Sequence, residues 1–456
     1  MTFTRRQILV GLGALGVAGL GAGGVRYWLG RPADVTTHDY ELIAAPLDME
    51  LVPGHKTPAW AFGGQAPGLE LRVRQGDSLR VRFINQLEVE TTIHWHGIRL
   101  PLEMDGVPYV SQAPVKPGEY FDYQFLCHDA GSFWYHPHTA SSEQLGRGLV
   151  GPLIVEEREP TGFFHERTLS LKTWHVDEQG AFTAFSVPRL AAREGTRGRL
   201  STINGQHLPV LDLPAGQVVR LRLLNLDNTI SYRLNLKGAG EARIYALDGH
   251  PVAPRALGKE YLLGAGMRID LAVKVPAAGQ EISLRNGPLR LATLRSVASA
   301  EAPGDWPSAL PANPVAEPDL TSAETLRFNF EWSAVLASPQ QQGPASYWQI
   351  NGQAWDINDK RCAERPIATL QKDRSYIFEL RNMAQYLHPI HLHGMTFRVL
   401  DSDRKRITPY YTDTYLLGKN ETARIAFVAD NPGVWMFHCH VIDHMETGLM
   451  AAIAVV

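Results

Sequence analysis

Apolar and polar residues alternate in short runs along most of the chain, and stretches with the period of a helix are scarce. Residues 243–249, 267–275 and 423–429 are examples of such runs. Because successive side chains of a strand point to opposite faces, this alternation predicts strands with one buried face. Gly, Pro, Asn and Asp separate the runs, as they do in Greek-key sandwiches. We therefore predict an all-β fold built from β-sandwiches.

One alternating pattern occurs three times, at residues 73–85, 213–225 and 370–382. Each copy carries a turn residue that tolerates left-handed backbone (Gly76, Gly216 or Asp373), and each ends on Asn. The copies lie too far apart for a solenoid repeat, so we predict three homologous domains. Their expected bounds are residues 35–158, 161–300 and 321–456, with a Pro-rich linker at residues 301–320.

The N-terminal residues 1–30 are predicted to be an export signal outside the fold. Arg5 and Arg6 precede an apolar, Gly-rich stretch at residues 8–24. This pattern is typical of a twin-arginine leader, and the alternative is an ordinary secretory signal with a chance arginine pair. Either signal places the mature protein outside the bacterial cytoplasm, and we expect the periplasm. No later apolar stretch is long enough to span a membrane.

Composition narrows the function classes. The net charge is −3 and Lys and Arg are scattered, which excludes an electrostatic binder of nucleic acid or of a membrane surface. Three cysteines are too few for a disulfide scaffold. A bridge between Cys127 and Cys362 stays open in an oxidising compartment. We expect the chain to act as a monomer.

Ten of the 17 histidines fall in four short clusters. In a strand, residues i and i+2 point to the same face, so each His-x-His pair aims two imidazoles at one place. One such pair alone would be a weak signal, since buried histidines bonded to backbone are commoner. Four pairs, two near each end of the chain, offer eight ligands of the kind that copper prefers. These are His94, His96, His136, His138, His391, His393, His438 and His440.

A second set of ligands surrounds the motif His438-Cys-His440. Cys439 and His444, together with His388, supply one thiolate and two imidazoles, which is the ligand set of a blue-copper electron-transfer centre. The histidines on either side of Cys439 point to the opposite face of the strand. One short strand would therefore link this centre to the eight-histidine site. A His-Cys-His motif alone could also bind zinc.

These residues resemble the ligand set of the multicopper oxidases, the family of laccases, ascorbate oxidase and bacterial copper-efflux oxidases. The resemblance covers the whole mature chain and includes residues 104–108 and 130–136. It implies three cupredoxin domains and four copper ions, namely one type 1 ion, one type 2 ion and a type 3 pair. The implied reaction couples one-electron oxidation of a small donor to the reduction of O2 to water.

The resemblance also implies a role for each ligand. His94 and His391 resemble the type 2 ligands, and His388, Cys439 and His444 resemble the type 1 set. The ligands that resemble those of the type 3 pair are His96, His136, His138, His393, His438 and His440. Asp105 matches the family's acid that helps to deliver protons, of which the reaction consumes four.

Two positions depart from the family's pattern. Many bacterial members have an axial methionine where this chain has Leu449, with Met450 one residue later. Alternation puts Met450 on the wrong face, so we expect Leu449 to leave type 1 copper three-coordinate, unless a bulge restores Met450. Met445 follows His444 where relatives carry a glutamate implicated in proton delivery, and Glu446 is expected to point elsewhere.

The electron donor is the least determined part of the prediction. No Met-rich insert appears between Ser333 and Trp355, where copper-efflux oxidases carry theirs, so a thioether site for cuprous ion is not visible. We expect laccase-like oxidation of phenols, with cuprous-ion oxidation as the alternative. Asp413 resembles an acid that contacts substrate metal in efflux enzymes, and the alternative is an ordinary surface aspartate.

Two further classes share the domain type. A copper nitrite reductase has the blue site but lacks the double link through His438-Cys-His440. A non-catalytic periplasmic assembly factor keeps the fold and loses the ligands, whereas this chain has the complete set. Both classes are therefore disfavoured.

Overall fold

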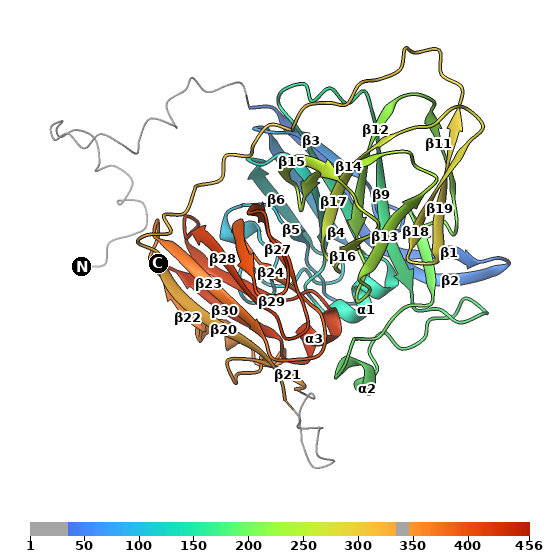
Figure 1. Ribbon diagram of the computed structural model, residues 1–456. Helices are drawn as coiled ribbons and strands as arrows, with labels where there is room; N and C mark the ends of the chain where they lie inside the picture. Colours follow the sequence, from blue (N-terminus) through green and yellow to red (C-terminus); the bar gives the residue numbers. More distant parts are fainter. Residues whose placement is uncertain (1–34, 334–345) are drawn as a thin grey trace, which may run out of the picture. The chain divides into compact units, whose positions relative to one another are not determined.

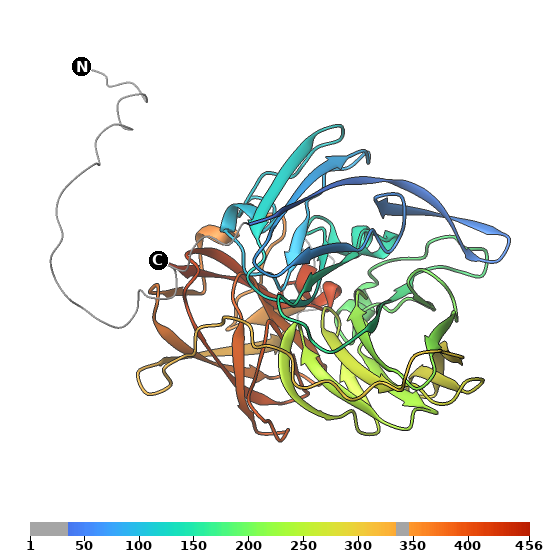
Figure 2. The same cartoon turned by 90° about the horizontal axis from the view of Figure 1, so that it is seen from above.

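The computed structural model describes residues 35–333 and 346–456, and the predicted export signal lies outside these residues. The described chain folds into six β-sheets with three short α-helices. Consecutive thirds of the chain form separate pairs of sheets, coloured blue to teal, green to yellow and orange to red (Figures 1 and 2). The predicted all-β fold is confirmed. We call the three pairs the first (residues 37–156), second (residues 165–297) and third (residues 324–455) sandwich.

The first sandwich consists of a sheet ordered β2-β1-β4-β6 and a sheet ordered β3-β8-β7-β5. The short strand β5 lies at the edge of its sheet and pairs with β7. The elements are β1 (Thr37–Val52), β2 (His55–Phe62), β3 (Leu71–Arg74), β4 (Ser78–Asn85), β5 (His94–His96), the 3-10 helix η1 (Leu102–Met104), β6 (Tyr120–Leu126), β7 (Gly131–His136), α1 (Ser141–Arg147) and β8 (Gly151–Glu156).

The second sandwich has a sheet ordered β10-β9-β12-β17-β14-β15 and a sheet ordered β11-β19-β18-β13-β16. Its apolar core is a cluster of its own. The elements are β9 (His165–Trp174), α2 (Pro188–Ala191), β10 (Leu200–Ile203), β11 (Val210–Pro214), β12 (Val218–Asn225), β13 (Tyr232–Lys237), β14 (Ala242–Leu247), β15 (His250–Ala256), β16 (Tyr261–Leu263), β17 (Arg268–Lys274), β18 (Glu281–Asn286) and β19 (Leu289–Val297).

The third sandwich has a sheet ordered β21-β20-β23-β28-β25-β26 and a sheet ordered β22-β30-β29-β24-β27. No helix or strand lies in the described stretch between β19 and β20, where the Pro-rich linker is predicted. The elements are β20 (Glu324–Trp332), β21 (Trp348–Ile350), η2 (Cys362–Glu364), β22 (Ala368–Leu370), β23 (Ser375–Asn382), β24 (His388–Leu392), β25 (Phe397–Ser402), β26 (Tyr410–Thr412), β27 (Thr414–Leu417), β28 (Thr422–Val428), β29 (Gly433–Cys439), α3 (Ile442–Glu446) and β30 (Met450–Val455).

The segment that occurs three times in the sequence takes the same path in each sandwich. A short strand leads through a turn residue with positive φ (88° at Gly76, 77° at Gly216 and 62° at Asp373) into a central strand. The asparagine at the end of that strand then donates its side-chain amide to main-chain oxygens of neighbouring loops, as Asn225 does to the oxygens of Ile230 and Gly264. Asparagine suits this place because one side chain can satisfy several buried loop groups.

The cores of the first and third sandwiches place the histidine-bearing strands. One cluster of buried apolar residues includes Trp95 of the first sandwich and Trp435 and Cys439 of the third. Strands β5 and β7 of the first sandwich and β24 and β29 of the third carry most of the clustered histidines. Within the described residues, no helix combines the length and apolar character that a membrane span requires.

Candidate metal centre

The eight paired histidines meet between the first and third sandwiches. The ring of His94 stacks on that of His393 with centroids 3.9 Å apart, and the ring of His96 stacks on that of His391 at 3.8 Å. Within each sandwich, strand pairing places two of the histidines opposite each other: His94 pairs with His136, and His391 pairs with His438. Seven of the eight side chains are buried, and His138 is partly buried. Strand alternation thus brings together residues that are about 300 positions apart in the sequence.

The nitrogens of these rings form three overlapping trios whose ligand atoms lie within 4.8 Å of one another. The trios are His94-His391-His393, His94-His96-His136 and His138-His393-His438. Several ring nitrogens that face these trios are buried and have no hydrogen-bond partner in the described chain. An unpaired buried polar atom costs about 1–3 kcal/mol, so a cluster of them calls for a ligand. Copper ions fit this set of donors.

The opposite edge of most rings is fixed by a hydrogen bond. The Nδ1 of His391 lies 2.9 Å from the main-chain oxygen of Asp413, an acceptor to which it can only donate. The Nδ1 atoms of His94, His136 and His438 make the same kind of bond to the main-chain oxygens of Asp105, Pro137 and Cys439. Each bond leaves the lone pair on Nε2, as a metal ligand requires.

The protonation of the rings also suits metal binding. Burial lowers the pKa of His438 to about 3, and burial together with neighbouring imidazoles holds the pKa of His136, His138 and His440 well below the ordinary value. The rings are therefore neutral at pH 7 and can donate their lone pairs without first losing a proton.

The three residues predicted as the type 1 set also converge. The Sγ of Cys439 lies 3.6 Å from the Nδ1 of both His388 and His444, and these two nitrogens are 3.1 Å apart. All three side chains are buried. Burial raises the pKa of the Cys439 thiol, so an ion bound between the three atoms would have to displace its proton. The spacing and chemistry of the three donors fit a type 1 copper ion.

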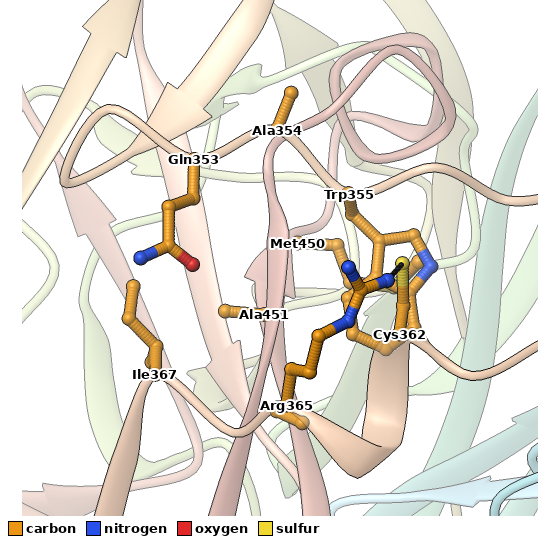
Figure 3. Close-up of a pocket in the computed structure, with 9 residues that line it drawn as sticks. Gln353, Ala354, Trp355, Cys362, Arg365, Ile367, Met450 and Ala451 are labelled. Atoms are coloured by element: carbon orange, nitrogen blue, oxygen red, sulfur yellow. Dashed lines mark hydrogen bonds between the residues drawn. The ribbon is translucent and has the colours of Figure 1, made fainter. Parts of the chain in front are cut away.

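Leu449 and Met450 point to different environments. Leu449 is buried in the same apolar cluster as Cys439, and its main-chain oxygen accepts a hydrogen bond of 3.0 Å from the Cys439 nitrogen. Met450 belongs to another cluster, with Trp355, and its side chain lies beside that ring in a pocket of about 110 Å³ (Figure 3). Strand β30 starts at Met450 in regular pairing with β29, so no bulge turns Met450 toward the triad.

Methionine in place of Leu449 is expected to lower the reduction potential of the type 1 site. A thioether beside the triad would add a weak fourth donor, which favours the oxidised ion. Redox titration of the blue absorption band measures the change. An unaltered potential in the variant would mean that residue 449 does not face the ion, and Met450→Leu serves as the control because its side chain lies elsewhere.

Asp105 lies where the resemblance places an acid. Its side chain is buried, with Oδ2 2.9 Å from the Nδ1 of His393 and Oδ1 3.1 Å from the Nδ1 of His94. It thus contacts one predicted type 2 ligand and one predicted type 3 ligand. Because a carboxylate can accept a hydrogen bond from each ring, Asp105 orients the two imidazoles.

Of the two predictions for Asp413, the one that makes it an ordinary surface residue is wrong. Asp413 is buried, and Arg268 of the second sandwich donates to its two oxygens at 2.9 and 2.6 Å. One of its oxygens also lies 3.3 Å from the Nε2 of His96. Burial alone would raise its pKa, but the Arg268 guanidinium and the nearby imidazoles bring it well below the usual range. Asp413 is therefore an anion inside the histidine cluster, out of reach of a surface-bound ion.

Glu446 lines the same pocket of about 300 Å³ as His138. Its two oxygens accept hydrogen bonds of 2.9 and 2.5 Å from the nitrogen and hydroxyl of Ser142 on α1. Burial raises the pKa of its carboxyl group. Met445, where relatives have the glutamate, is buried in the apolar cluster with Met450.

The cysteine bridge that the sequence left open is not formed. Cys127 is buried in the core of the first sandwich, whereas Cys362 begins η2 of the third and is free as well. The Cys362 sulfur lies 3.6 Å from the Nη2 of Arg365 at the pocket shown in Figure 3. The three cysteines therefore lie in separate parts of the fold.

Sequence reasoning did not find Arg268 and Asp248. Asp248 accepts a hydrogen bond of 2.6 Å from the Arg268 nitrogen, and burial raises its pKa to about 7. Both residues stand in segments that read as ordinary half-exposed strands, so nothing in the sequence marks them. They bring a buried charge network of the second sandwich to the edge of the histidine cluster.

The fold and the site together define a copper-binding protein whose ligands come from two sandwiches. Family models described as multicopper oxidase match residues 46–160 and 336–456. A multi-copper oxidase of solved structure from Pseudomonas thermotolerans is 76% identical, with a TM-score of 0.88, and the match covers 92% of this chain and 100% of that chain. This chain belongs to the multicopper oxidase family, and it is a copper-binding oxidoreductase.

Two relatives of this chain carry names that indicate different roles. Laccase-2 of Botryotinia fuckeliana is 27% identical over 458 residues, which cover 87% of this chain and 78% of that protein. Copper resistance protein A of Pseudomonas syringae pv. tomato is 38% identical over 180 residues, which cover 38% of this chain and 29% of that protein. Family membership therefore does not select the electron donor.

Proposed function

We propose that this multicopper oxidase is laccase-like: it oxidises phenolic or similar donors one electron at a time and reduces O2 to water. The observation that carries the proposal lies at the end of strand β29, where Cys439 belongs to the triad. His438, before it, and His440, directly after the strand, face the eight-histidine cluster, and the ring of His440 lies 4.8 Å from that of His96. The chain would hold four coppers, one in the triad and three among the eight histidines. When bound, these ions supply electron uptake and oxygen reduction.

The protein's own residues provide the path for electrons between the two copper sites and the surroundings of the bound ions. The covalent bonds between Cys439 and its two histidine neighbours give a short route for electrons from one site to the other. Asp105 holds His94 and His393 in place and is the acid nearest to the predicted type 2 and type 3 ligands. The pocket that His138 and Glu446 share gives water and O2 a route to the cluster. The apolar residues packed around the triad keep water away from it.

A phenolic donor is favoured over cuprous ion by the surroundings of His444. The main-chain oxygen of Arg193 accepts a hydrogen bond of 2.7 Å from the Nε2 of His444. The segment around it, residues 187–199, contains no Met, Cys or His, the side chains that cuprous ion prefers. Cuprous-ion oxidation stays the second candidate because of the similarity to copper resistance protein A over 38% of the chain.

The experiment that decides between the donors is steady-state oxygen uptake by the copper-loaded protein. We expect kcat/KM for 2,6-dimethoxyphenol to exceed that for cuprous ion. The copper content should be about four ions per chain, and a protein without copper should show no oxygen uptake with either donor. A much larger kcat/KM for cuprous ion would contradict the laccase-like assignment.

Three expectations from the sequence belong to the same proposal. The protein is exported through a leader at residues 1–30 and works as a monomer in the periplasm. Its three domains are residues 35–158, 161–300 and 321–456, and each contains one sandwich. The first and third of these domains hold the copper, and the second has no metal motif of its own.

A further inference from the structure

A segment of the second sandwich covers His444. Residues 187–199 follow β9 and include the short helix α2, seen in Figure 1. The Nε2 of His444 donates a hydrogen bond of 2.7 Å to the main-chain oxygen of Arg193. The Nε1 of Trp348, whose ring packs against His444 at 4.4 Å, donates to the oxygen of Ala191 at 2.8 Å. The covering segment is thus bonded both to the ligand and to its neighbour.

Two further contacts hold the segment in place. The nitrogen of Thr196 donates to the Asp443 carboxylate at 2.5 Å, and the hydroxyl of Thr229 donates to the oxygen of Thr196 at 2.7 Å. Ala191 and Ala192 are buried in the same apolar cluster as Cys439. The segment is therefore packed into the structure like a core element.

Residues 187–199 shield the outer edge of the His444 ring from solvent. This imidazole is 0% exposed, and the Nε2 of His388 is also shielded from solvent. A donor molecule therefore cannot touch either ring of the triad. Arg193 is an exposed residue with a bonded connection to the triad, because its main-chain oxygen accepts the His444 hydrogen bond. That bond offers a path for an electron from outside.

The outer face of the same segment is positively charged. It carries four exposed arginines and one exposed glutamate, Glu194. Within residues 35–333 and 346–456, none of the four guanidinium groups forms an ion pair with a carboxylate. The arginines are Arg189, Arg193, Arg197 and Arg199.

We propose that residues 187–199 form the donor-docking surface of this enzyme and that the surface selects anionic phenols. The inference rests on the proposed laccase-like function. A phenol with a carboxylate would dock on the arginines, and its phenolate would lose one electron toward His444 and become a phenoxyl radical. Four such phenolates, one O2 and four protons give four phenoxyl radicals and two waters. The same positive face repels cuprous ion.

The test uses two donors that differ by one carboxylate group, the anion syringate and the neutral 2,6-dimethoxyphenol. In the double variant Arg193→Gln/Arg197→Gln, we expect the ratio of kcat/KM for syringate to kcat/KM for 2,6-dimethoxyphenol to fall about fivefold at low salt. The main-chain oxygen that accepts the His444 bond is retained. The control is Arg255→Gln/Arg290→Gln, which removes two exposed arginines from elsewhere on the second sandwich. The control ratio should equal that of the unaltered enzyme.

A second readout does not depend on turnover. Hexacyanocobaltate(III), a redox-inert trianion, should bind the copper-loaded enzyme in calorimetry and bind the double variant more weakly, and added salt should remove the difference. Equal ratios and equal anion binding in the variant and the control would overturn the docking surface. If the unaltered enzyme oxidises neither phenol, the laccase-like function fails, while anion binding still decides whether the docking surface exists.

Discussion

Asparagine in place of Asp105 is expected to slow oxygen reduction by about 10²–10⁴-fold, the range that a positioned acid or base contributes to catalysis. The carboxylate accepts from His393 and approaches His94, at 2.9 and 3.1 Å. Asparagine has one acceptor oxygen, so it cannot serve both rings, and it cannot release a proton to oxygen. Turnover with 2,6-dimethoxyphenol under air measures the loss.

Two measurements separate this role from general damage. Under anaerobic conditions, the donor should bleach the blue band of Asp105→Asn as fast as that of the unaltered enzyme, because the triad is untouched. Asp122→Asn, at an exposed carboxylate of the same sandwich that pairs with Arg82, should turn over normally. If the anaerobic bleaching slows as much as the aerobic turnover, the defect lies in electron uptake and Asp105 does not act at the oxygen-reducing site.

The fold was predictable because its signals are local. The period of two gives strands, and the three copies of one pattern give three sandwiches. The left-handed turns at Gly76, Gly216 and Asp373 follow from residue type, since glycine and aspartate tolerate positive φ. Periodicity cannot give the order of strands in each sheet, because that order depends on contacts between segments far apart in the chain.

The ligands were predictable for the same reason. Each His-x-His pair carries its geometry within three residues, so the face on which two imidazoles lie follows from strand alternation alone. The stacking of His94 on His393 and of His96 on His391 does not follow from alternation, and it was not predicted. The difference between Leu449 and Met450 is again local, and alternation placed both side chains on the faces that the structure has.

The residues that contact the predicted ligands or lie beside them could not be predicted from the sequence. Asp413 sits in a segment that reads as a surface loop, and its burial depends on Arg268 arriving from the second sandwich. Glu446 lies on the one-turn helix α3, where strand alternation does not apply, and it turns toward Ser142. Arg193 contacts His444 through its main chain, so its side-chain identity carries no signal at all. Each of these contacts joins two different sandwiches.

Methionine in place of Arg268 is expected to destabilise the copper-free protein by about 3–5 kcal/mol, because it breaks a buried ion pair by removing one partner. The side chain of Arg268 is 0% exposed and bonds Asp413 through two nitrogens. Its main-chain nitrogen and its guanidinium also contact Asp248. Without the guanidinium, two carboxyl groups would lie buried side by side. Unfolding in guanidinium chloride, followed by circular dichroism, measures the change.

The control for this variant is Arg295→Met, which breaks an exposed two-point pair with Asp212 in the same sandwich. Solvent screens that pair, so its loss should change stability little. Arg268→Met, unlike the control, should also alter the electron paramagnetic resonance signal of the type 2 ion, because Asp413 holds His391 through its main-chain oxygen. A loss of stability with an unchanged signal would make Arg268 a support of the fold alone. A loss of stability together with an altered signal would mean that Arg268 sets the geometry of the oxygen-reducing site. The second sandwich, which has no metal motif of its own, would then act on that site through one arginine.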